Sequence, residues 1–165
     1  MQRLDKSDIQ RALVNVTKSE RAAVTFDPGF ADVPWDVLDF YGWRDPRKPQ
    51  RGYVVRERAD GPVAVALQTS ASTAANPRKA MCSLCRAVDA ANSIALFAAR
   101  RTGAEGRRGD TVGTYICAGL DCSAQLRTPT PKLGRAIIGA QDADRDELAA
   151  GLLVRLDAFL VSVGV

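Results

Sequence analysis

The sequence predicts an α+β fold, in which two antiparallel β-hairpins lie between short N-terminal helices and a longer C-terminal helix. Three observations indicate this class: two segments alternate apolar and polar residues, both ends carry apolar residues at helical spacing, and two close cysteine pairs flank the second alternating segment. We expect a single domain over residues 1–165. It divides into a helical and irregular arm (1–50), a hairpin and cysteine region (51–127) and a C-terminal helix (142–163).

The N-terminal residues carry two helix-start signals. Asp5 can cap a short helix that places Ile9 and Leu13 on one face. Residues 17–20, with the sequence TKSE, fit a capping box and predict a second short helix. The Asp-Pro-Gly sequence at 27–29 is expected to end that helix.

Residues 30–50 are expected to be irregular, because three prolines interrupt them. This stretch nevertheless holds both tryptophans of the chain. Its large aromatic side chains are Trp35, Phe40, Tyr41 and Trp43. We interpret it as a segment that packs over the core, and an exposed recognition strip is the alternative.

The first hairpin is predicted over residues 51–68. Its turn is expected at Asp60-Gly61, and Val63, Val65 and Leu67 alternate in the returning strand. Residues 69–79, which are rich in Ser, Thr, Ala, Asn and Pro, are expected to form a flexible loop.

The second hairpin is predicted to join residues 94–99 to residues 112–116. Its connection, residues 101–110, contains three glycines together with Arg107 and Arg108, and is expected to be a loop.

A C-terminal helix is predicted from acidic residues at 142–147, which suit the first turn of a helix, and from the apolar spacing that follows them. Its apolar face comprises Leu148, Leu152, Leu156, Phe159 and Leu160. Core packing is the expected role of this face, and a partner-binding groove is the alternative.

The composition excludes several classes of enzyme. Histidine is absent, so neither a Ser-His-Asp nor a Cys-His arrangement can form, and no metal can be held by histidine. Neither the GxxxxGK[ST] nor the GxGxxG phosphate-binding pattern occurs. We therefore expect a protein that is not an enzyme and has no small-molecule substrate. It has no candidate membrane span or secretory signal, so a cytoplasmic location without membrane contact is expected.

Charge is concentrated in the middle of the chain. The net charge is +4, and residues 78–135 hold ten basic and four acidic groups. Such a segment would attract an acidic protein or a phosphate backbone. The alternative is that these residues offset the charge of a metal–thiolate centre and are otherwise ordinary solvated arginines.

The four cysteines fall into two close pairs. Cys82 and Cys85 form a C-x-x-C, Cys117 and Cys122 form a C-x4-C, and 31 residues separate the pairs. Two such pairs, joined by an insert of hairpin size, are typical of a tetrahedral thiolate site. Four thiolates leave no open coordination position, so we predict one structural Zn²⁺ ion, with Arg78, Lys79 and Arg86 close enough to offset its charge.

Two other readings of the cysteines remain. Disulfides are disfavoured in a chain without an export signal. A redox C-x-x-C normally opens a helix and needs no second pair. The predicted order of cysteine knuckle, β-hairpin and second pair at a helix start, with Asp121 as N-cap, is that of a treble-clef zinc finger.

Residues 81–85 (MCSLC), 96–101 (LFAARR) and 109–117 (GDTVGTYIC) together resemble the elongation factor G-binding family, the FusB-type proteins of fusidic acid resistance. Residues 35–46 (WDVLDFYGWRDP) are similar to the short, single-domain members of that group. The resemblance extends over most of residues 1–127.

The resemblance implies a function in translation. Family members bind elongation factor G, and the characterised resistance proteins help to release it from ribosomes on which fusidic acid has trapped it. The four cysteines match the family's zinc ligands by position. The partner-contact residues implied in the same way are Leu84, Phe97, Arg107, Arg108 and Tyr115.

A nucleic-acid-binding zinc domain, with ribosomal RNA as its partner, is the second hypothesis. The arginine- and glycine-rich connection at 101–110 suggests it, and Tyr115 or Phe97 could stack on bases.

Overall fold

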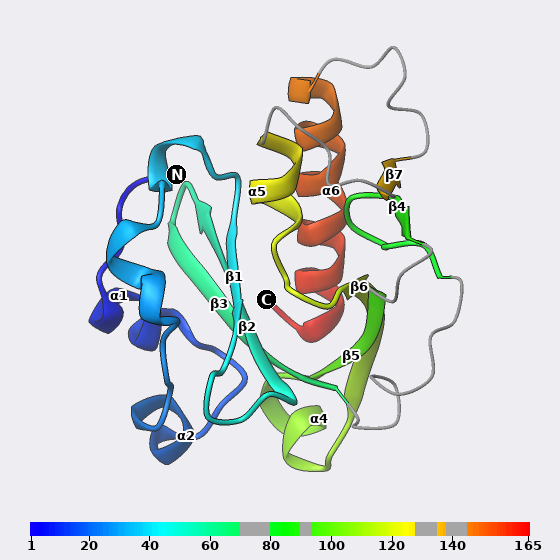
Figure 1. Ribbon diagram of the computed structural model, residues 1–165. Coiled ribbons are helices and arrows are strands. Elements are labelled where there is room, and N and C mark those ends of the chain that lie inside the picture. Colours follow the sequence, from blue (N-terminus) through cyan, green and yellow to red (C-terminus); the bar gives the residue numbers. More distant parts are fainter. Residues whose placement is uncertain (70–79, 90–93, 128–134, 138–144) are drawn as a thin grey trace.

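One antiparallel sheet lies at the centre of the molecule, between the N-terminal helices and the C-terminal helix (Figure 1). The computed structural model describes residues 1–69, 80–89, 94–127, 135–137 and 145–165. The helices are α1 (Lys6–Ala12), α2 (Lys18–Ala22), the 3-10 helices η1 (Pro28–Asp32) and η2 (Trp35–Val37), α4 (Gly103–Arg107), α5 (Cys122–Arg127) and α6 (Arg145–Val163). The strands are β1 (Tyr41–Arg44), β2 (Arg51–Arg58), β3 (Gly61–Thr69), β4 (Ala87–Asp89), β5 (Ile94–Arg100), β6 (Thr111–Cys117) and β7 (Arg135–Ile137). The α+β prediction is confirmed.

Both predicted N-terminal helices are present, and each begins at a capping box. The Asp5 side chain accepts from the N–H of Asp8, and the Thr17 side chain accepts from the N–H of Glu20. The predicted stop at 27–29 is wrong, because α2 already ends at Ala22. The Asp-Pro-Gly sequence instead starts η1, where the Asp27 side chain caps the turn and proline occupies its first position.

The central sheet has the strand order β1-β2-β3-β5-β6. The two predicted hairpins are confirmed: β2 pairs with β3 around a turn at Asp60, and β5 pairs with β6 along its whole length. The connection at 101–110 is not only a loop, because it contains the single turn of α4, across which Arg101 pairs with Glu105 at 2.7 Å. The second sheet, β4-β7, has two strands. Of the predicted loop at 69–79, Thr69 belongs to β3, and the remainder lies outside the described residues.

The aromatic segment was expected to be irregular, but residues 41–44 form the edge strand β1. Tyr41 and Trp43 are buried, whereas Gly42 and Arg44 are partly exposed, which is the alternation of a strand. The segment is too short for this alternation to stand out between its flanking prolines. The packing role is confirmed, since Trp35 and Phe40 are buried as well.

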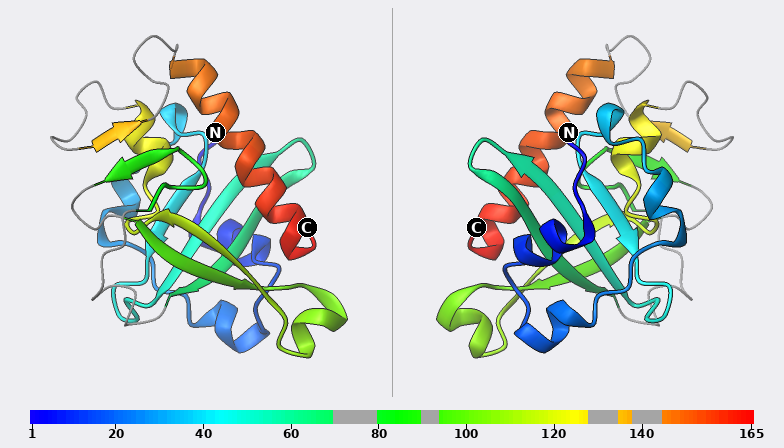
Figure 2. Two further views of the ribbon diagram at one scale, coloured as in Figure 1. Left: turned by 90° about the vertical axis from the view of Figure 1, so that its right-hand side faces the viewer. Right: turned by 90° about the vertical axis from the view of Figure 1, so that its left-hand side faces the viewer.

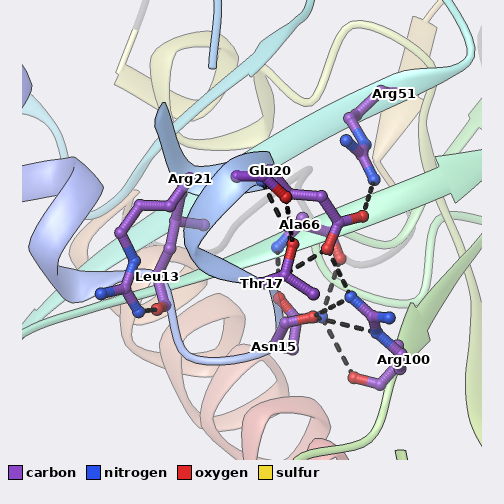
Figure 3. Close-up of polar contacts among 9 residues, drawn as sticks. Leu13, Asn15, Thr17, Glu20, Arg21, Arg51, Ala66 and Arg100 are labelled. Atoms are coloured by element: carbon purple, nitrogen blue, oxygen red, sulfur yellow. Dashed lines mark hydrogen bonds and ion pairs between the residues drawn. The ribbon is translucent and has the colours of Figure 1, made fainter. Parts of the chain in front are cut away.

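The two halves of the sheet meet over only two residue pairs, Gln68↔Ala98 and Thr69↔Phe97. Beyond this point the Asn15 side chain fills the gap between β3 and β5 (Figure 3). Its Nδ2 donates to the carbonyls of Ala66 (2.9 Å) and Arg100 (3.1 Å), and its Oδ1 accepts from the N–H of Ala66 (2.8 Å). The side-chain amide of Asn15 therefore makes hydrogen bonds that further residue pairs between β3 and β5 would otherwise supply.

Glu20 reinforces this junction from α2. Its carboxylate binds Arg51 of β2 at 2.8 Å and Arg100 of β5 at 2.7 Å (Figure 3). A backbone hydrogen bond from Thr17, together with both arginines, lowers the pKa of Glu20 to about 2, against an opposing contribution from burial. The predicted helix cap is therefore also an ionic link across the sheet.

The sheet separates two cores, because successive side chains of a strand point to opposite faces. Tyr53 and Val55 belong to the first, and Val54, between them, belongs to the second. The first, which we call the aromatic core, comprises Leu4, Ile9, Leu13, Val24, Trp35, Leu38, Tyr41, Trp43, Tyr53, Val55, Ala64 and Ala66. The second, which we call the metal-side core, contains all four cysteines and the buried leucines of α5 and α6.

The C-terminal helix covers the metal-side core and runs obliquely past the β2–β3 hairpin in Figure 2. Leu152, Leu156 and Leu160 are buried, as the apolar spacing predicts, whereas Leu148 and Phe159 are partly buried at its margin. The helix is described from Arg145, so the first residues of its predicted range lie outside the described part. In the described ranges, no helix combines the length and hydrophobicity needed to cross a membrane.

Candidate metal centre

The first cysteine pair occupies a tight turn that precedes β4. The N–H of Cys85 donates to Sγ of Cys82 at 3.4 Å, and the N–H of Cys82 donates to the carbonyl of Ala87 at 2.9 Å. Arg86 adopts a φ of 62°, in the left-handed region, which allows the chain to reverse after the second thiol. The local fold is a knuckle that presents both sulfurs to one point.

The second pair joins the end of β6 to the start of α5. Cys117 is the last residue of the strand, one residue beyond its predicted end, and Cys122 is the first residue of the helix, as expected. Asp121 precedes the helix, but its carboxylate accepts no capping hydrogen bond from the described residues. Between the two cysteines, the N–H of Leu120 donates to the carbonyl of Cys117 at 2.8 Å, and Leu120 has a φ of 58°. Both knuckles therefore reverse the chain through a residue in the left-handed region.

The four sulfur atoms lie within 4.8 Å of one another. Sγ of Cys82 is 3.7 Å from Sγ of Cys122, and Sγ of Cys85 is 3.5 Å from Sγ of Cys117. Four sulfurs placed about 2.3 Å from a tetrahedral zinc ion would be separated by about 3.8 Å. The spacing fits one zinc ion, and the cysteines are free rather than joined as disulfides.

Burial makes this a closed site. Each of the four cysteines is at most 2% exposed, so neither substrate nor water has a route to a bound ion along the described surface. Hydrogen bonds from the Cys117 and Cys122 thiols lower the pKa of Cys85. The pKa of Cys122 is raised by the hydrogen bonds that Cys122 makes with the neighbouring sulfurs. Four thiolates together therefore require a cation, which is the chemistry of a structural zinc ion.

Arg155 of α6 supports the first knuckle, which is a contact that sequence reasoning missed. Its Nε donates to the carbonyl of Leu84 at 2.6 Å. Burial lowers the pKa of Arg155, the charge of Arg86 lowers it further, and the thiolates of Cys85 and Cys82 act in the opposite direction. An arginine among the apolar residues in the middle of the helix is the only signal that the sequence offers for this role.

Of the basic residues predicted to offset the thiolate charge, Arg86 is exposed in the turn, and Arg78 and Lys79 lie outside the described residues.

Leu120 attaches the second knuckle to the sheet. Its side chain is 1% exposed and lies over two glycines, Gly42 of β1 and Gly52 of β2. A Cβ atom at Gly42 would lie 2.4 Å from the carbonyl oxygen of Leu120, so no larger residue fits there without a shift. The metal site is thereby fixed against the same strands that form one wall of the aromatic core.

Two of the five predicted partner-contact residues are in the core. Leu84 is 2% exposed and Phe97 is 0% exposed, which makes them packing residues rather than surface contacts. The alternation along β5 explains Phe97, because its neighbour Leu96 takes the outward position. Leu84 lies inside its knuckle, where the carbonyl binds Arg155.

The other three predicted contact residues are at the surface, at two ends of the second hairpin. Arg107 and Arg108 lie on and directly after α4, at the hairpin connection. Tyr115 lies near the other end of β6 and is paired across the strands with Leu96, and each is 37% exposed. The carbonyl of Tyr115 accepts from the N–H of Ser83 at 2.7 Å, which joins this surface to the first knuckle.

A comparison with known families gives one match. The family model described as the FBP C-terminal treble-clef zinc-finger matches residues 8–163. The match includes both cysteine pairs and leaves out only residues 1–7 and the last two residues, so the predicted treble clef and its single zinc ion are confirmed. No curated protein and no solved structure matches the chain.

Proposed function

Because the chain belongs to the FBP C-terminal treble-clef zinc-finger family, we propose that it is a non-catalytic zinc protein that binds elongation factor G and modulates translation. The resemblance of its cysteine and hairpin segments to FusB-type proteins supports this choice of partner. Release of the factor from drug-stalled ribosomes would be a consequence of that binding.

The observation that carries the proposal is the exposed apolar pair Leu96 and Tyr115 on a hairpin held by the metal centre. Ser83 of the first knuckle and Cys117 at the end of β6 fix the strand that carries Tyr115. A rigid surface of this kind loses little conformational entropy when it binds. An exposed tyrosine is also among the residue types that contribute most to protein interfaces.

Charge at the hairpin connection is available to guide the encounter. Arg107 and Arg108 are exposed, and Arg108 lies 3.7 Å from Asp110 in an ion pair that is open to solvent. Exposed pairs are weak, so both guanidinium groups can interact with an acidic partner. Such charges mainly accelerate association and set its dependence on salt.

Ribosomal RNA remains the second candidate because of the same two exposed arginines. Its support is weaker, since Phe97, one of the two proposed base-stacking residues, is buried. Carboxylates also pair with Arg101 and Arg108 and reduce the positive field around the connection. A protein partner therefore accounts better for this surface.

Calorimetric titration of the zinc-loaded chain with purified elongation factor G tests the proposal. We expect saturable binding, which Tyr115→Ala weakens by about 30-fold or more. The matched control is Val154→Ala on α6, because Val154 is 70% exposed and lies on a different element. Absence of binding by the folded, zinc-loaded chain would refute the partner. A binding constant for RNA that falls steeply with salt, without binding of the factor, would favour the alternative.

A further inference from the structure

The two edge strands of the central sheet differ in how well they are protected from pairing with another chain. The edge strand β1 has four residues, ends at Arg44 and is followed by Asp45 and Pro46. Short length, charge and proline are features by which proteins prevent such pairing. The other edge strand, β6, has seven residues with neither a charge nor a proline. Each pairs with one residue of β5, so no bulge twists the edge away, and β6 lacks all of these protections.

The outer edge of β6 carries backbone groups without a partner. The carbonyl of Tyr115 accepts from the N–H of Ser83, which lies outside the sheet, so this carbonyl points away from β5. Backbone groups of successive residues in an antiparallel ladder point to alternate sides, so those of Thr111 and Gly113 also point away from β5. In the described ranges, no residue forms a hydrogen bond with the N–H or C=O of Thr111 or Gly113. Donors and acceptors at strand spacing are therefore available along this edge.

Exposure along β6 agrees with an open edge. Thr111, Gly113 and Tyr115 are exposed, whereas Val112, between the first two, is partly buried. Tyr115 and its cross-strand neighbour Leu96 lie on the exposed face, directly beside the edge. The edge is therefore continuous with the apolar pair on which the proposed function depends.

An extended peptide segment is the ligand that matches these groups. Only an extended backbone presents N–H and C=O groups at the spacing of an unpaired strand edge. Its side chains alternate between the two faces of the sheet, so one of them would lie over Tyr115 and Leu96. A second copy of this chain fits less well, because two copies with a net charge of +4 each repel one another. The segment therefore comes from a different protein.

We propose that the outer edge of β6 is a strand-addition site, at which a protein partner adds an extended segment with an apolar side chain over Tyr115. This inference rests on the proposed function, because it describes how the partner engages the same hairpin. Hydrogen bonds to the backbone of Thr111 and Gly113 supply affinity, and the contact with Tyr115 supplies selectivity. The bond from Ser83 to the carbonyl of Tyr115 limits the added segment at one end.

Amide hydrogen exchange, resolved by residue, tests the site in the zinc-loaded chain. In the free chain, the amide of Gly113 should exchange about 100-fold faster than those of Val112 and Thr114, which face β5. Saturation with purified elongation factor G should slow exchange at Gly113 to the rate of its two neighbours.

Three outcomes of this experiment contradict a proposal. Slow exchange at Gly113 in the free chain would show that the edge is already covered, and would overturn the inference alone. Binding of the factor without added protection at Gly113 would also overturn the inference, and the proposed function would stand. Absence of binding would refute the proposed function, and this inference with it.

Two substitutions at one position separate backbone pairing from side-chain contact. Gly113→Pro removes the outward N–H and keeps the bonds between β6 and β5, because an edge strand tolerates proline where its N–H faces solvent. It should weaken binding of the factor about tenfold. The matched control Gly113→Ala keeps the N–H and adds a Cβ that meets Leu96 at an ordinary 3.4 Å. It should change the affinity less than about twofold. Equal affinities of the two variants, each with one zinc ion bound, would contradict strand addition.

Discussion

The aromatic core and the metal-side core lie on opposite faces of the same sheet and share its strands, yet they are stabilised differently. In the aromatic core, Trp43 stacks on Tyr41 and Tyr53 with ring centroids 5.2 and 4.8 Å apart, so apolar contact is sufficient. In the metal-side core, four buried thiols lie at the centre of the cluster. Without an ion they are crowded polar groups, and with zinc they become a cross-link. One face of the sheet is therefore stable through packing alone, and the other depends on a ligand.

Removal of zinc should have the largest effect. Structural zinc sites contribute about 10–16 kcal/mol of apparent binding energy that is available to folding. Chelation, or the substitution Cys117→Ser, should therefore unfold the metal-side core and release α6, which circular dichroism would record as a loss of helix. Tryptophan emission reports on the aromatic core and should change less. A metal-free chain with an unchanged spectrum would contradict this dependence on the ion.

Trp43→Ala should have the next largest effect, on the other core. The ring is 3% exposed, and its Nε1 donates to the carbonyl of Thr25 at 3.0 Å. Truncation of such a side chain costs about 3–5 kcal/mol, measurable by urea denaturation. Zinc content should remain one ion per chain. The control Trp43→Phe keeps a ring in place and should cost less; an equal cost would argue that stacking contributes little.

Gly42→Ala should weaken the contact between the two cores. Its Cβ would lie 2.4 Å from the carbonyl oxygen and 2.9 Å from Cβ of Leu120, so the second knuckle must move away from the sheet. We expect a loss of about 1–3 kcal/mol in the free energy of unfolding. Gly113→Ala is the matched control, because its Cβ would meet Leu96 at 3.4 Å, an ordinary contact. Equal losses of unfolding free energy in the two variants would contradict the role of Leu120 as the attachment point.

The smallest effect should come from acid. Because the folded-state pKa of Glu20 is lowered to about 2, its contribution to stability is complete above about pH 5 and is lost as the pH falls toward 2. The carboxylate is 27% exposed, so screening limits the contribution to about 1–2 kcal/mol. Glu20→Gln should lower stability at pH 7 by that amount and flatten the acid dependence of the urea midpoint. An unchanged slope between pH 5 and 3 would contradict this.

The elements that the sequence predicted well are those with local causes. Asp5 and Thr17 form their caps within three residues, and a turn at Asp60 is sufficient to define the first hairpin. The cysteine pairs belong to the same group, because their spacing alone indicates a tetrahedral site. The caps, the turn and each cysteine pair depend on residues that are close in sequence, although the site itself joins two pairs that are distant in sequence, such as Cys82 and Cys122.

The features that escaped prediction depend on distant partners. The strand β1 is defined by its pairing with β2, and Phe97 and Leu84 are buried only because other elements cover them. Arg155 reaches a carbonyl 71 residues away in sequence. Leu120 likewise packs on Gly42 and Gly52, which are distant from it in sequence, and no short motif indicates this contact. Local periodicity cannot determine which face a tertiary contact will cover.

The position of α6 after all four cysteines determines the order in which a nascent chain can mature. Residues 1–69 hold every member of the aromatic core, so this face can assemble before the C-terminal helix has emerged. The other face still lacks Leu152, Leu156 and Leu160, as well as the Arg155 bond to the first knuckle, until the last helix has emerged. During synthesis, therefore, the thiols exist for a time without their covering helix.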